Sequence, residues 1–91
     1  MVYKLIFPER YLKRARQFLK KHPALRNQYQ KTIELLELNP HHPSLRFHAL
    51  DGRLKGLSSV SINMSYRIVL EIMIKKNEII FVDIGNHDQV Y

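Results

Sequence analysis

Residues 66–74 read Tyr-Arg-Ile-Val-Leu-Glu-Ile-Met-Ile, and the regular alternation in this segment is the starting point for the fold prediction. Apolar residues occupy every second position from Tyr66 to Ile74, whereas Arg67 and Glu71 fall on the positions between them. Successive side chains of a β-strand point to opposite faces. The alternation therefore predicts a strand over 66–74, with one apolar face toward the core and a second face that carries Arg67.

The segments on either side of this strand complete an antiparallel meander. Residues 78–84 are apolar at consecutive positions, which is typical of a central strand with both faces covered. Residues 56–62 form a weaker strand that contains three serines, followed by a turn at 63–65. Gly85 ends the last strand, and we expect residues 86–91 to form a tail.

Two amphipathic helices precede the meander. Residues 9–21 place apolar side chains at helical spacing beneath a strongly basic outer face. Residues 23–38 carry a second apolar stripe; Pro23 suits the first turn of this helix, and Asn39-Pro40 ends it. The connection between the helices is short, so they are predicted to form an antiparallel hairpin.

The complete order predicts an α+β fold for a single domain over residues 1–91. Residues 2–7 form a first strand that stops before a proline, and residues 40–53 form an ordered connection. The order is β-α-α-β-β-β, an antiparallel-rich twisted sheet with the two-helix hairpin packed on one face. The first strand pairs at an edge of the meander or between its strands. The face opposite the helices stays open and carries Arg67.

Composition removes several classes of protein. The chain has 91 residues, of which 45% are hydrophobic, and it contains no cysteine. A disulfide scaffold, a zinc ribbon and a thiol enzyme are therefore excluded. The sequence shows neither a secretory signal nor an apolar run long enough to span a bilayer. We expect a cytoplasmic protein with no membrane partner.

The charge is strongly positive and unevenly distributed. Fifteen Lys and Arg residues oppose eight Asp and Glu residues, giving a net charge of +7. Nine of the basic residues and only three of the acidic ones lie in residues 1–45. A small basic domain of this kind concentrates around polyanions, so the partner is a nucleic acid or an acidic protein, unless the charge merely solubilises the surface.

Three local patterns in this order resemble one known family. Residues 48–56, His-Ala-Leu-Asp-Gly-Arg-Leu-Lys-Gly, are similar to a stretch of the YafQ branch of the RelE/ParE toxin superfamily. Residues 66–70, Tyr-Arg-Ile-Val-Leu, resemble a strand of the RelE and YoeB branches. Residues 85–91, Gly-Asn-His-Asp-Gln-Val-Tyr, resemble the ending of the YafQ branch. The likeness in element order spans the whole chain and is greatest to the RelE and YafQ branches.

The resemblance implies the toxin of a type II toxin–antitoxin system. Members of the RelE and YafQ branches are mostly mRNA interferases, which enter the ribosomal A site and cleave the codon there by attack of the ribose 2′-hydroxyl. It implies an endoribonuclease with ribosome, mRNA and a cognate antitoxin as partners, and with no cofactor or metal. Two alternatives remain open: a toxin of the ParE kind that binds DNA gyrase without cleaving anything, and a basic structural nucleic-acid binder.

Two residues are the main catalytic candidates. Proton transfer near neutral pH suits an imidazole, and His87 matches the histidine of the YafQ branch. Charge that grows on a phosphate needs a fixed cation, a role that the resemblance gives to Arg67. The alternatives are a surface histidine in a tail and an arginine paired with Glu71 or Asp83. We predict that Arg67 and His87 converge on the open face, because antiparallel pairing joins the start of one strand to the end of its partner.

Further candidates follow from the resemblance. Tyr91 matches an aromatic that acts as a base or stacks on a nucleotide, or else it anchors the tail. His48 would donate to the phosphate or orient the substrate, or else it caps the connection. Ser61 and Ser65 stand where the YafQ branch has a histidine and an aspartate, so part of the proton-transfer set of that branch is replaced. The residues expected to contact RNA or the ribosome are Arg10, Lys13, Arg14, Lys20, Lys21, Arg53 and Lys55.

Overall fold

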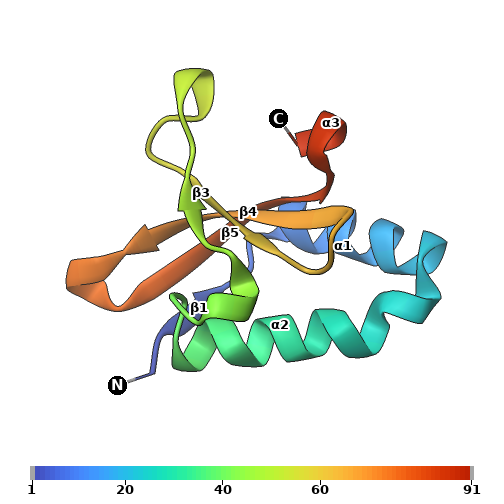
Figure 1. Cartoon of the computed structure of the whole chain (residues 1–91), viewed down its shortest axis with the longest axis horizontal. Helices are drawn as coiled ribbons and strands as arrows, with labels where there is room; N and C mark the ends of the chain where they lie inside the picture. Colours follow the sequence, from blue (N-terminus) through green and yellow to red (C-terminus); the bar gives the residue numbers. More distant parts are fainter. Residues whose placement is uncertain (1, 91) are drawn as a thin grey trace.

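A computed structural model describes residues 2–90, with the backbone alone given for Gln89. Five strands and three α-helices follow one another, with short 3-10 turns between them (Figure 1). The strands are β1 Lys4–Ile6, β2 His48–Ala49, β3 Ser58–Ser61, β4 Tyr66–Met73 and β5 Glu78–Asn86. The helices are α1 Glu9–Lys21, α2 Arg26–Leu38 and α3 His87–Val90, and the 3-10 turns are η1 Pro23–Leu25, η2 Pro43–Leu45, η3 Gly52–Leu54 and η4 Ile74–Lys76.

The strands form one mixed sheet in the order β1-β5-β4-β3-β2. β1 runs parallel to β5, and the other neighbours are antiparallel. The α+β class and the meander of the last three long strands are therefore confirmed. The first strand takes an edge position beside β5, which is one of the two placements that the sequence left open.

The helical hairpin covers one face of this sheet and builds the main core. Buried side chains of α1, α2 and the central strands form one cluster, which includes Phe18, Leu36 and Ile68. The hydroxyls of Tyr11 and Tyr29 lie 2.9 Å apart and join the two helices beneath their polar surface. Burial raises the pKa of both phenols, so both hydroxyls stay protonated.

The apolar residues of β5 do not follow a strict alternation along the strand, and a β-bulge is the reason. Val69 pairs with Asp83, but the next residue of β4, Leu70, pairs with Phe81, so Val82 has no place in the register. The extra residue reverses the alternation along β5. Phe81 and Ile84 therefore both reach the main core although an odd number of positions separates them.

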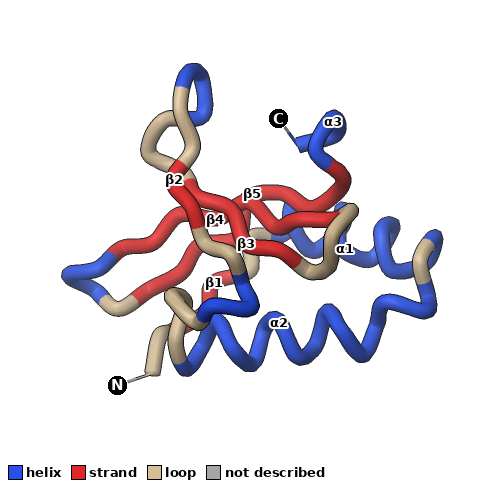
Figure 2. Tube along the Cα trace, in the orientation of Figure 1, coloured by secondary structure: helices blue, strands red, loops and turns tan. Residues whose placement is uncertain are grey.

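The opposite face carries a second, much smaller cluster. Leu50, Val69 and Val90 are buried together there, so α3 and the segment after β2 both pack on this face of the sheet. Figure 2 shows α3 and the β2–β3 connection rising from the side of the sheet that faces away from α2. The face that was predicted to be open is therefore covered at two places, by α3 and by the β2–β3 connection, and it is exposed between them.

Several boundaries differ from the sequence prediction: β1 and β3 are shorter than expected, and α2 begins at Arg26 because Pro23–Leu25 forms a 3-10 turn. His48–Ala49 forms strand β2 inside the expected connection 40–53, where two residues are too few to show a period of two. β4 ends at Met73, because a turn closed by Asn77 in the left-handed conformation takes up Ile74, whose side chain is 73% exposed. β5 continues through Gly85 to Asn86, and residues 87–90 form α3 where a tail was expected. None of the described helices has the length and apolar character that crossing a membrane requires.

Candidate functional site

Arg67 lies near the start of β4 on the face opposite the helical hairpin. It pairs with Ser61 of β3 on one side and with Gly85 of β5 on the other. Paired residues of antiparallel strands point to the same face, so Arg67 shares its face with both, while the neighbouring Ile68 belongs to the main core. Gly85 has no side chain, so β5 places no bulky group beside Arg67 on this face.

Three neutral acceptors hold the half-buried guanidinium of Arg67. Its Nε–H donates to the hydroxyl of Ser59 at 3.1 Å. Its Nη2 donates to the backbone carbonyl of Arg46 at 3.2 Å and lies 3.3 Å from Nδ1 of His48. These contacts come from β3, from the residue that ends η2 and from β2. The guanidinium is therefore fixed in place without losing its charge to a carboxylate.

The alternative of a salt bridge at Arg67 is not what the described residues show. The ion pairs among residues 2–90 join Arg14 to Asp83 and Arg16 to Glu9. Asp83, one of the two carboxylates considered for Arg67, is thus engaged by α1, and it also accepts a hydrogen bond from the backbone N–H of Ile84.

The contact with Arg67 fixes the tautomer of His48. A guanidinium has donors and no acceptor, so Nδ1 of His48 must accept the hydrogen bond. A neutral imidazole that accepts at Nδ1 carries its proton on Nε2. His48 is exposed, so this Nε2–H is offered to solvent or to a ligand on the open face. In this state the imidazole can donate a hydrogen bond at Nε2 but cannot accept a proton there.

His87 is placed at the same end of the sheet as Arg67. It opens α3 directly after Asn86, which pairs with Tyr66, and its side chain is exposed. The last residue of α3, Val90, packs against Val69 of β4, which turns this short helix onto the open face. The predicted convergence of Arg67 and His87 agrees with this register, and contact between the two side chains stays a prediction.

The remaining candidates lie around this face or on the outside of α1. Arg53 and Lys55 are exposed on the connection between β2 and β3, where Gly52 and Gly56 take positive φ angles of 66° and 97°. The other basic candidates lie along α1, well away from the loop; all are exposed except the half-buried Arg14, namely Arg10, Lys13, Arg14, Lys20 and Lys21. Tyr91 lies outside the described residues.

Two groups in the site were missed by sequence analysis. Ser59 is fully buried and receives the Nε–H of Arg67, but a serine in a weak strand carries no signal of such a role. Arg46 contributes a backbone carbonyl and has a left-handed φ of 49°, which is uncommon for a residue other than glycine. A backbone acceptor cannot be identified from side-chain type, so only the fold reveals it.

Ser61 and Ser65, the two serines singled out in the sequence, both make hydrogen bonds to Asn63. Ser61 lies directly opposite Arg67 in the β3–β4 pair, and its hydroxyl donates to the carbonyl of Asn63. The backbone N–H of Ser65 donates to the side chain of Asn63 in the hairpin turn. Among the described residues, no three His, Asp or Glu side chains are grouped so that they could hold a metal ion.

Comparison with known proteins gives one family and a consistent set of folds. The model of the family "ParE toxin of type II toxin-antitoxin system, parDE" matches residues 9–91. No curated protein matches the sequence significantly.

Solved structures of toxins superpose on almost the entire chain. YafQ from E. coli strain BL21(DE3) is 15% identical with a TM-score of 0.81, and 98% of each chain is covered. The E. coli DinJ–YafQ toxin–antitoxin complex gives 17% identity and a TM-score of 0.79 over 100% of this chain and 99% of that one. The YoeB–YefM complex from Staphylococcus aureus gives 16% identity and 0.72 over 96% and 99%. At these identities the likeness establishes the fold.

Proposed function

The chain belongs to the ParE toxin family of type II toxin–antitoxin systems, within the RelE/ParE superfamily, and we propose that it is a ribosome-dependent endoribonuclease that cleaves mRNA in the A site. The observation that supports this activity is the fixed guanidinium of Arg67 with the Nε2–H of His48 beside it. A positioned cation and an adjacent N–H donor are what phosphoryl transfer requires. A toxin that acts by binding alone has no need of them.

The proposed reaction uses the substrate's own ribose as the nucleophile. The 2′-oxygen attacks the adjacent phosphorus, the bond from phosphorus to the 5′-oxygen breaks, and the products carry a 2′,3′-cyclic phosphate and a 5′-hydroxyl. Arg67 stabilises the charge that grows on the non-bridging oxygens, and His48 donates a hydrogen bond to the same phosphate. His87 gives a proton to the departing 5′-oxygen. The proton of the 2′-hydroxyl leaves to water or to the phenolate form of Tyr91.

The basic face of α1 explains the expected need for the ribosome. Exposed lysines and arginines along one helix bind RNA phosphates with little sequence preference. The sparse proton-transfer set, with serines at positions 61 and 65, is expected to work slowly on free RNA. Docking on ribosomal RNA would hold the codon against Arg67 and supply the orientation that the chain alone lacks.

The activity is tested by inducing the chain and mapping mRNA ends by primer extension. We expect growth arrest and cuts in codon register, and a loss of both of about 100-fold or more in Arg67→Ala and His87→Ala. Arg26→Ala, an exposed change of the same type on α2, is the control and should stay toxic. Growth arrest with DNA damage and no RNA cuts would instead support the gyrase-binding alternative, as would an unimpaired His87→Ala.

An antitoxin partner follows from the surface of the helical hairpin. A groove of about 590 Å³ runs between α1 and α2 and is lined mainly by apolar side chains, with polar groups of α2 at its margin. An apolar groove on a chain of net charge +7 suits an amphipathic helix with acidic flanks. We propose that the cognate antitoxin places such a helix here. The lining residues are Phe7, Leu12, Leu19, Arg26, Asn27, Tyr29, Gln30 and Ile33.

This partner is tested by co-expression with the product of the neighbouring gene. Leu12→Glu places a charge in the groove and should abolish co-purification, whereas Leu38→Glu, at a 63% exposed position outside the groove, should have no effect. Equal capture of both variants would show that the antitoxin binds elsewhere.

A further inference from the structure

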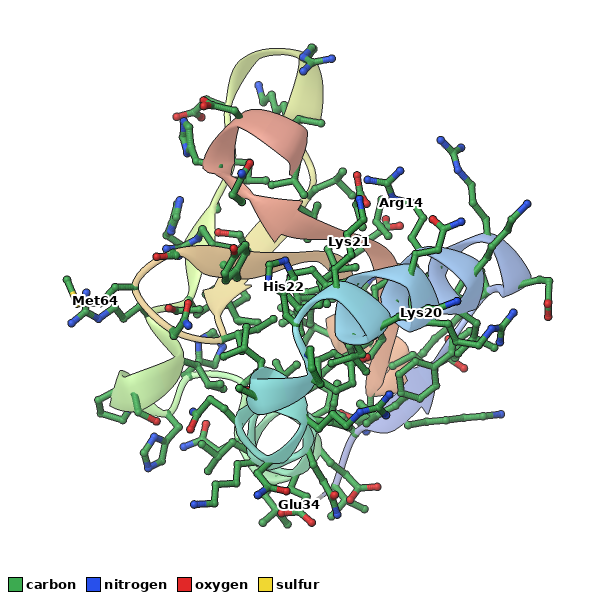
Figure 3. All side chains as sticks on the ribbon, turned by 90° about the vertical axis from the view of Figure 1, so that its right-hand side faces the viewer. Arg14, Lys20, Lys21, His22, Glu34 and Met64 are labelled. Carbon is green, nitrogen blue, oxygen red and sulfur yellow. The ribbon has the colours of Figure 1, made fainter. Side chains whose placement is uncertain are left out.

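A second concave surface lies at the end of the sheet where Arg67 is found, but on the helix-covered side. It has a volume of about 190 Å³ and is lined by Arg14, Gln17, Phe18, Lys21, His22 and Ile84. A concavity of this size has room for a phosphate together with part of its ribose. In Figure 3 the labelled side chains of Arg14, Lys21 and His22 gather beside the part of β5 that leads into α3.

The polar groups of this pocket are suited to an anion. Lys21 is exposed and contributes an ammonium group, and Gln17 contributes amide N–H donors. Arg14 commits its Nε–H to Asp83, so among the described residues the donors of its two amino groups remain available. The Asp83 carboxylate offsets one positive charge, and Lys21 leaves the pocket with a net positive charge.

Aromatic packing holds the floor of the pocket rigid. The centroid of the His22 ring lies 4.7 Å from the centroid of the Phe18 ring and 4.6 Å from that of the Tyr66 ring. The rings of Phe18 and Tyr66 are themselves 5.1 Å apart in an edge-on arrangement. His22 is thereby fixed between α1 and β4, which lowers the ordering cost of binding a ligand.

The position of the pocket connects it to the open face. Tyr66, which supports His22, is followed directly by Arg67 on the other face of β4. Ile84, which lines the pocket, is followed directly by Gly85, the partner of Arg67. The pocket and the Arg67 guanidinium therefore lie on opposite faces of the same strand ends, one residue apart along each strand.

We propose that this pocket binds a backbone phosphate of the RNA strand that Arg67 holds, farther along that strand than the phosphate adjacent to the Arg67 contact, so that the substrate strand passes over this end of the sheet. The inference rests on the proposed function, because it assumes that RNA lies on the open face. An acidic segment of the antitoxin is the competing ligand. It is less favoured because the apolar groove lies along the Leu12 and Leu19 side of α1, away from the pocket.

The test measures binding of a short fluorescent RNA in which every 2′-hydroxyl is methylated, so that cleavage cannot occur. Gln17→Glu puts a carboxylate into the pocket without touching the core, and Gln30→Glu makes the same change on α2, in the other groove. We expect Gln17→Glu to weaken binding by about 10-fold and Gln30→Glu by about 2-fold or less. Lys21→Gln should weaken binding more than Lys20→Gln, the neighbouring lysine that does not line the pocket.

Arg67→Ala, measured in parallel, separates the two claims. If it weakens RNA binding while Gln17→Glu behaves like Gln30→Glu, the pocket assignment is overturned and the proposed function stands. If neither Arg67→Ala nor the pocket variants change RNA binding, both are overturned. If Gln17→Glu leaves RNA binding intact but prevents antitoxin co-purification, the pocket belongs to the antitoxin. Melting temperatures equal to that of the parent chain show that each variant is folded.

Discussion

The two faces of the sheet are built from the same strands but differ in what their side chains do. On the face toward α1 and α2, consecutive strands send large apolar side chains into one continuous core. On the other face the described residues form a much smaller cluster, in which Leu50, Val69 and Val90 are buried and Leu54 and Leu57 pack against them at partly buried positions. Stability is therefore concentrated on one face, which leaves the other free to hold an arginine whose charge is not cancelled.

Neighbouring residues of β4 show this division most directly. Ile68 has no exposed surface and lies in the main core, whereas Arg67, one position earlier, faces the opposite way and makes three hydrogen-bonding contacts. A one-residue step along the strand changes the role from packing to chemistry. The same step on β5 passes from Ile84 in the main core to Gly85, the residue paired with Arg67 on the open face.

The largest expected difference is between two single variants of β4, Ile68→Ala and Arg67→Ala. Ile68→Ala removes a fully buried side chain, so we expect a loss of about 2–5 kcal/mol in the free energy of unfolding and a fall of about 10 °C or more in Tm. Arg67→Ala removes hydrogen bonds at a half-buried site and should cost about 1 kcal/mol, while toxicity is lost.

Thermal melting and growth arrest, measured on both variants, check this separation. The comparison would be wrong if Arg67→Ala destabilised the chain as much as Ile68→Ala, because Arg67 would then be a structural residue. Ile68→Val is the matched control for volume, since it keeps the branched shape and should cost about 0.5–1.5 kcal/mol.

The helix-covered face could be predicted from the sequence almost completely. Strand and helix periods are local properties, so the strand predicted over 66–74 ends within one residue of its observed end, the helix over 9–21 has its observed bounds, and the helix over 23–38 begins three residues too early. The first strand was left with two possible positions, and it takes the edge beside β5. The open face was predicted less well, because its parts are not periodic. β2 has two residues, α3 has four, and Val82 is a single bulged residue. Such features depend on contacts across the fold and leave little trace in local patterning.

The candidate site shows the same limit. Resemblance supplied Arg67 and His48 as separate residues, but it did not predict that they touch, because their contact depends on pairing between β2 and β3. Ser59 and the carbonyl of Arg46 carried no signal at all. Charge pattern identified the basic face of α1, whereas the pocket formed by α1, His22 and β5 appears only when the helix is packed on the sheet.

The second prediction has a smaller expected effect and concerns what His48 contributes to the open face. Arg67 is already held by Ser59 and by the Arg46 carbonyl, so its position does not depend on His48. The role of His48 should therefore reside in its outward Nε2–H.

Asparagine can replace the Nδ1 acceptor but not the outward donor, whereas glutamine can reach with an amide N–H toward the position of Nε2. We expect His48→Gln to keep most of the activity and His48→Asn to lose about 10-fold to 100-fold, measured as the rate of codon cleavage on ribosomes. The reason is that one hydrogen bond to a charged phosphate is worth about 1.5–3 kcal/mol. The reverse order, with His48→Asn active and His48→Gln impaired, would show that His48 serves to orient Arg67, and the open face would then present a single working cation where we propose a cation and a donor acting together.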